Sequence, residues 1–198
     1  MQTTSQAIKA YAEALPEGAT LSARELLHLG ERAAVDQALS RLVRRGELLR
    51  VRRGLFALPM KTRFGSRAPS VEAVVEHIAK STGERVSQSG ASAANLLGIS
   101  TQNPSRQVFW TSGPSRHLKL GAQSVELKHV PSWQLRAPNS RAGHAFRALA
   151  YFGKSEAAQA LRRIKATLNE EEKRELLSLR ASAPTWMAKE LSALAPSQ

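Results

Sequence analysis

The sequence predicts an α+β protein in which an N-terminal winged helix-turn-helix precedes a larger mixed domain with a small antiparallel sheet and several helices. Its 198 residues suffice for one large domain or two small ones, and 42% of them are hydrophobic, enough for a packed core. Apolar residues recur at helical spacing over 31–45, and two short strand-like stretches rich in arginine follow at once. Further strand-like stretches lie between 107 and 130, after which helical patterns resume.

The first 58 residues carry signals for three helices. A helix is predicted over 5–15, because proline and glycine follow it. A second is predicted over 23–29, where Ser22 and Glu25 have the spacing of a capping box. The strongest pattern lies over 31–45, and its predicted buried stripe consists of Val35, Ala38, Leu39 and Leu42.

A basic hairpin is predicted directly after the third helix. Gly46 is expected to end that helix, and strands over 48–51 and 55–58 can pair around a turn at 52–54. Helix, helix, turn, helix and basic hairpin is the order of a winged helix-turn-helix. We therefore assign residues 1–58 to a domain of that kind.

The remaining chain is predicted to form a linker and a second domain. Residues 59–69 are polar, basic and interrupted by glycine and proline, which indicates a linker, and 70–198 then forms the C-terminal α+β domain. Strands are predicted over 107–112, 117–120 and 124–130. Helices are predicted over 71–81, 91–97, 140–152, 156–168, 170–181 and 184–194.

Positive charge is concentrated in the first domain and the linker. The chain has 29 Lys and Arg against 16 Asp and Glu, a formal net charge of +13. Between 32 and 67, ten basic residues are balanced by Asp36 and Glu47 alone, so this stretch holds +8 of the total. Such an excess favours an acidic partner, most commonly nucleic acid. The basic residues of the C-terminal domain, Arg147 among them, are expected on its surface, where some extend the contact with nucleic acid and most are ordinary surface charge.

The helix over 31–45 has an outer face suited to a DNA duplex. Gln37 can hydrogen-bond adenine edges, Arg41 can bind guanine or a phosphate, and the small Ala33 allows close approach. With the apolar stripe facing the core, steps of 100° per residue place the following on the outer face: Ala33, Gln37, Ser40, Arg41 and Arg44.

The predicted hairpin supplies further cations. Arg50, Arg52 and Arg53 lie on it, a position that suits contacts with backbone phosphates or with an adjacent minor groove. Together with Arg32 at the start of the helix, these residues complete the predicted contacts with double-stranded DNA. A solvated basic face, or a winged helix that docks RNA or protein, would produce a similar pattern.

The sequence does not favour catalysis. There is no Cys, and Asp36 is the only aspartate, whereas metal-dependent phosphoryl transfer usually needs two or three close carboxylates. No two histidines have zinc-ligand spacing, and the serine-rich segment 87–92 lacks the Gly-Lys-Ser/Thr of a phosphate loop. The glutamates at 170–172 follow Asn169 at a predicted helix start, where they complement the helix dipole. We therefore expect no catalytic residue, no metal site and no cofactor.

The sequence also indicates a cytoplasmic protein without a membrane partner. No apolar run approaches the roughly 18–20 residues that a membrane-spanning helix needs. The beginning of the chain lacks the charged start and apolar core of a signal peptide.

Several motifs resemble those of the AbiEi family. They are RLVRRGELLRVRRGLFAL at 41–58, SGASAANLLGIS at 89–100, QVFWTSG at 107–113, and HLKLG with VELKHVPSW between 117 and 133. The resemblance implies a bacterial antitoxin of a type IV toxin–antitoxin system, associated with abortive infection and phage defence. It also implies a winged helix that binds repeats in the promoter of its own operon, with Gln37, Ser40, Arg41, Arg44 and the hairpin 50–53 as DNA contacts.

The same resemblance implies that the C-terminal domain counteracts a toxin of nucleotidyltransferase type without forming a stable complex. No motif in 70–198 marks a residue for that role. The leading hypothesis is thus an antitoxin and transcriptional autorepressor, a monomer in solution or a cooperative pair on DNA. In the alternative hypothesis, 70–198 neutralises the toxin by direct complex formation and DNA binding is secondary. In a third, the C-terminal domain is a degenerate nucleotidyltransferase-like enzyme.

Overall fold

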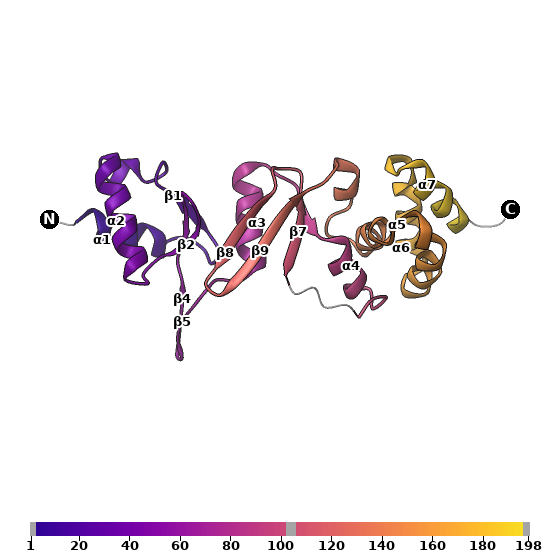
Figure 1. The fold of residues 1–198 in the computed structure, drawn as a ribbon, viewed down its shortest axis with the longest axis horizontal. Coiled ribbons are helices and arrows are strands. Elements are labelled where there is room, and N and C mark those ends of the chain that lie inside the picture. Colours follow the sequence, from indigo (N-terminus) through magenta and orange to yellow (C-terminus); the bar gives the residue numbers. More distant parts are fainter. Residues whose placement is uncertain (1–2, 102–105, 196–198) are drawn as a thin grey trace. The chain divides into compact units, whose positions relative to one another are not determined.

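The computed structural model describes residues 3–101 and 106–195, and it has the mixed α+β composition that the sequence predicts (Figure 1). Contacts divide the chain into two units. Unit 1 comprises the chain up to residue 84 together with 117–125, and unit 2 comprises 85–116 together with the chain from 126 onward. Each unit contains its own cluster of buried apolar side chains.

Unit 1 begins with two helices and a three-stranded antiparallel sheet. Helix α1 packs against α2, and the strands lie in the order β1-β3-β2. This order of elements, with β2 and β3 as the wing, is that of a winged helix. The elements are α1 (Thr4–Glu13), β1 (Thr20–Ser22), the 3-10 helix η1 (Leu27–Leu29), α2 (Arg32–Arg44), β2 (Leu49–Arg52) and β3 (Leu55–Ala57).

The α-helix predicted over 23–29 does not form, and that prediction is wrong. The capping hydrogen bonds are present; in one of them the Ser22 N–H donates to Glu25 Oε2 at 2.7 Å. The chain nevertheless continues as turns and the single 3-10 turn η1. An α-helix of seven residues forms too few hydrogen bonds to offset the free-energy cost of helix nucleation. The turns and η1 instead bury Leu26 completely in the unit 1 core. Strand β1 just before it was not predicted.

The segment expected to be a linker contains a hairpin, and a helix follows it. The hairpin consists of β4 (Met60–Thr62) and β5 (Gly65–Arg67). Helix α3 (Val71–Thr82) begins as predicted at Ser70, whose side chain accepts a hydrogen bond from the Ala73 N–H. By its contacts α3 belongs to unit 1.

The predicted strands of the second half form a sheet, with one strand more than expected. Its order is β6-β7-β9-β8. Strand β6 (Val86–Gln88) was not predicted, and it pairs antiparallel with β7. The other elements of this stretch are α4 (Gly90–Leu96), β7 (Gln107–Thr111), β8 (Arg116–Leu120) and β9 (Gln123–His129).

The C-terminal helices pack around one long helix, α5 (Arg141–Thr167). Two helices were predicted in this segment. In the structure they join as α5, with a kink at Gly153, whose φ of 73° and ψ of −178° are not helical. None of the helices formed by the described residues is long and apolar enough to cross a membrane. The short elements around α5 are η2 (Ser132–Leu135), α6 (Glu170–Ser178), η3 (Leu179–Ser182), α7 (Thr185–Leu191) and η4 (Ser192–Leu194).

The structural interpretation of the acidic cluster 170–172 is confirmed. Asn169 caps α6, and the Glu172 N–H donates to Asn169 Oδ1 at 2.8 Å in a complete capping box. Glu172 also lies 3.2 Å from Arg141 Nε. These carboxylates serve the start of a helix.

Arg147, expected on the surface, is fully buried in α5. Its guanidinium donates to the carbonyl oxygens of Arg136 at 3.2 Å and Pro138 at 2.8 Å. Burial lowers the pKa of Arg147 to about 10. These hydrogen bonds hold the segment that precedes α5 against the helix itself. The charge pattern of the sequence does not show this role.

Substitution of Gly90 by alanine should destabilise the protein. Helix propensity alone would favour alanine in α4, by up to about 1 kcal/mol. A Cβ at Gly90, however, would lie 2.5 Å from Tyr151 Cβ and 2.6 Å from the Arg147 carbonyl oxygen in α5. We expect the overpacking to prevail and the free energy of unfolding to fall by about 1–3 kcal/mol in a urea titration. A more stable Gly90→Ala variant would contradict this close approach.

Candidate nucleic-acid interface

Helix α2 presents one apolar and one polar face. Val35, Ala38, Leu39 and Leu42 are buried in the unit 1 core, which confirms the predicted stripe. Because those four positions face inward, the opposite face must point to solvent. All the predicted contacts on α2 are exposed, namely Arg32, Ala33, Gln37, Ser40, Arg41 and Arg44.

Four of these residues lie together. Gln37, Ser40, Arg41 and Arg44 line one shallow groove along α2, and Asp36 is its fifth lining residue. A bidentate amide, a hydroxyl and two guanidinium groups on one helix face can hydrogen-bond both base edges and phosphates. Contact with DNA remains a prediction for each of them.

Among the described residues, Arg32 is the predicted contact that forms an ion pair. Its Nε donates to Asp36 Oδ2 at 2.9 Å, across one turn of α2. Both side chains are more than half exposed, so the pair contributes little to stability. A phosphate could therefore replace Asp36 as the partner of Arg32 at small cost.

The wing holds the other three arginines at the surface. Arg50 and Arg52 alternate with the buried Val51 along β2, and Arg53 follows at the turn. The register shifts between Arg50 and Arg52, which marks a bulge. The Arg50 guanidinium carbon lies 5.7 Å from the centroid of the Phe56 ring, a cation–π contact that orients it.

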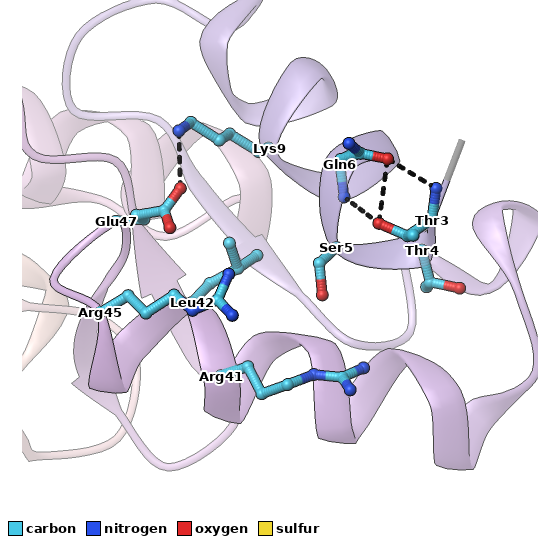
Figure 2. Close-up of a pocket in the computed structure, with 9 residues that line it drawn as sticks. All are labelled: Thr3, Thr4, Ser5, Gln6, Lys9, Arg41, Leu42, Arg45 and Glu47. Atoms are coloured by element: carbon cyan, nitrogen blue, oxygen red, sulfur yellow. Dashed lines mark hydrogen bonds and ion pairs between the residues drawn. The ribbon is translucent and has the colours of Figure 1, made fainter. Parts of the chain in front are cut away.

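A pocket of about 720 Å³ lies between the start of α1 and the end of α2 (Figure 2). Figure 2 shows the side chains of Arg41, Arg45 and Ser5 around this space. The N-terminus of α1 contributes backbone N–H groups that have no partner within the helix, and Thr3 caps it with Gln6 in a capping box. Guanidinium groups beside a helix N-terminus suit an anion such as a phosphate.

The acidic residue of this pocket is already paired. Glu47 Oε2 lies 2.6 Å from Lys9 Nζ, and this contact raises the pKa of Lys9 and lowers that of Glu47. Lys9 thus offsets the charge of Glu47, and the charges of Arg41 and Arg45 leave the pocket positive. No carboxylate in the described ranges forms an ion pair with either arginine.

Arg45 is the residue that sequence reasoning missed. It lies in the basic stretch 32–67, but it was not among the predicted contacts. Its spacing of four residues from Arg41 is the signal that could have found it, because residues i and i+4 lie on one side of a helix. The N-terminus of α1, which completes the pocket, is a tertiary neighbour that spacing cannot show.

The histidine of β9 has a local partner. His129 is exposed, and its Nδ1 donates to the Gly113 carbonyl oxygen at 2.9 Å. Within residues 3–101 and 106–195, no three His, Asp or Glu side chains are placed to hold a metal ion.

Unit 1 therefore has a winged helix whose outer helix face and wing are cationic. The chain belongs to DUF6088, a family of unknown function, whose family model matches residues 7–176.

A crystal structure of the RV2827C protein from Mycobacterium tuberculosis has a similar fold, with a TM-score of 0.51 and 18% sequence identity. The match covers 96% of this chain and 75% of that chain. At this identity the likeness concerns the fold. No curated protein matches the sequence.

The pocket in Figure 2 should bind inorganic phosphate. In an NMR titration at constant ionic strength, we expect the backbone amide signals of Ser5 and Arg45 to shift and saturate, because a phosphate there accepts hydrogen bonds from α1 and from the guanidinium groups. Arg45→Ala should abolish the saturable shift at Ser5. Arg162→Ala, which removes an exposed cation of α5, should leave it unchanged. Equal shifts in both variants would contradict the pocket as an anion site.

Proposed function

We propose that this protein is a cytoplasmic antitoxin that also represses its own operon by binding promoter DNA through the winged helix of unit 1. In this proposal α2 enters a major groove, and the β2–β3 wing contacts the backbone. The proposed base contacts are Gln37, Ser40 and Arg41. The proposed backbone contacts are Arg32, Arg44, Arg45, Arg50, Arg52 and Arg53.

One observation carries the DNA-binding part of the proposal. The exposed face of α2 and the wing carry seven arginines, and of these seven only Arg32 forms an ion pair with another described residue. Unpaired like charges on one surface repel each other, so a polyanion that binds there gains from each of them. The second support is the resemblance of 41–58 to the AbiEi family.

The antitoxin part rests on that resemblance, which extends through the motifs between 89 and 133. In this proposal the partner toxin is a nucleotidyltransferase-like protein, and its gene lies beside the gene of this chain. No particular residue of unit 2 is assigned to toxin neutralisation.

The protein should bind DNA from upstream of its own gene with a strong salt dependence. If about six phosphates are neutralised, log K should fall with log[salt] at a slope of about −5. Arg41→Ala should cost roughly 1–3 kcal/mol on the operator and less on random DNA, because it removes a base contact. Arg52→Ala should weaken both DNAs equally and reduce the slope by about 1. Fluorescence anisotropy over a salt series measures all of these quantities.

Two outcomes would count against this assignment. A flat salt response, or equal affinity for operator and random DNA, would contradict the proposed repressor function. A relaxed preference in Arg52→Ala with a uniform loss in Arg41→Ala would mean that the wing reads bases and the helix binds the backbone.

Antitoxin activity should be separable from DNA binding. When the gene directly downstream is expressed and inhibits growth, co-expression of this chain should restore growth. Arg41→Ala should restore growth equally well while it fails to repress a promoter fusion, because the substitution lies in unit 1 on the α2 surface. Failure of the wild-type chain to restore growth would remove the antitoxin role. A stable complex in size-exclusion chromatography would favour neutralisation by direct contact.

A further inference from the structure

The hairpin formed by β4 and β5 carries positive charge and an aromatic side chain at its tip. Figure 1 shows it as a narrow two-stranded ribbon directed away from the other elements of unit 1. Every residue from 61 to 67 is exposed. From 48 to 71 the chain contains no Asp or Glu, and its six cations are Arg50, Arg52, Arg53, Lys61, Arg63 and Arg67.

Phe64 occupies the turn and has no packing role in the fold. It is 87% exposed, more than any other large hydrophobic side chain of the described residues. The Arg63 guanidinium carbon lies 4.7 Å from the centroid of its ring. The tip is therefore an aromatic ring covered on one face by a cation, and both groups face solvent in the free protein.

The tip is held in a defined conformation. The Thr62 hydroxyl donates to the Gly65 carbonyl oxygen at 2.8 Å and accepts from the Phe64 N–H at 3.2 Å. These two bonds close the turn around Arg63 and Phe64. A partner that binds the tip does not have to order it first, which favours binding.

Two ion pairs hold the base of the hairpin against the rest of unit 1. Lys61 Nζ lies 3.7 Å from Glu13 Oε1, and Arg67 Nη2 lies 3.4 Å from Glu17 Oε1. Glu17 also accepts a hydrogen bond from the Ser70 N–H at 3.3 Å. The acids of this region thus neutralise the base of the hairpin, and the charge of Arg63 at the tip stays free for a partner.

We propose that the β4–β5 hairpin is a second DNA-contacting element, in which Arg63 enters the minor groove and Phe64 inserts as a wedge at a base step. The inference rests on the proposed DNA binding of α2 and the wing. Only Leu58 and Pro59 separate β3 from β4, so one duplex held by the wing is adjacent to the hairpin. Arginine favours the negative potential of the minor groove, and apolar wedges there unstack and kink the duplex.

The test uses the full-length protein on its own upstream DNA, with 2-aminopurine placed at successive base steps and fluorophores at the two ends. Wild-type protein should raise 2-aminopurine emission at one step and bring the ends closer together. Phe64→Ala should abolish both signals and weaken binding by about fivefold to a hundredfold, the range of one aromatic–base contact. Because Phe64 is exposed, its removal should leave the circular dichroism spectrum and melting temperature unchanged.

A matched control and a reporter variant separate the outcomes. Leu96→Ala removes another large exposed side chain, 58% exposed in α4, and should change neither signal. The emission of Phe64→Trp, measured against wild type, should be quenched by the operator duplex.

If wild type and Phe64→Ala bind alike without local unstacking while Arg41→Ala loses affinity, the hairpin inference fails and the proposed function stands. If wild type shows no preference for the operator, the proposed function fails first. Blue-shifted Phe64→Trp emission on phosphatidylserine–phosphatidylcholine vesicles, without quenching by DNA, would overturn the inference in favour of a lipid surface.

Discussion

The burial of one apolar stripe on α2 determines which face of this helix is available to a partner. Val35, Ala38, Leu39 and Leu42 are almost completely removed from solvent in the core of unit 1. Hydrophobic burial is the largest favourable contribution to folding, so the helix cannot rotate without losing it. The polar face is thereby directed outward. This orientation of α2 also places Arg41 and Arg45 beside the start of α1.

Charge in unit 1 follows a consistent division. The acids Glu13, Glu17 and Glu47 pair with Lys61, Arg67 and Lys9. These pairs lie around α1 and the base of the β4–β5 hairpin, where they join parts of the fold. Within the part of the chain that the structure describes, the arginines of the α2 face and the wing have no acidic partner, apart from Arg32. Surface pairs of this kind contribute little energy, but their distribution determines where positive charge remains available.

Local signals predicted most of the fold. Helical spacing located α2, α3 and the C-terminal helices, and capping residues such as Ser70 and Asn169 marked helix starts. The same signals failed at 23–29, where the capping box formed without an α-helix because Leu26 packs into the core along a tighter path. They also failed for β1 and β6, since strands of three residues depend on a partner strand that lies far away in sequence.

The sequence by itself determined the α+β class, the buried stripe of α2 and the concentration of positive charge between 32 and 67, because periodicity and composition are local properties. The tertiary structure alone decided which cationic side chains form contacts within the protein. It paired Lys61 and Arg67 with glutamates of the α1 region, buried Arg147 where it donates to two carbonyl oxygens, and left Phe64 exposed on a hydrogen-bonded turn. Each of these outcomes depends on which distant residue lies within a few ångströms, and such distances arise only when the chain packs.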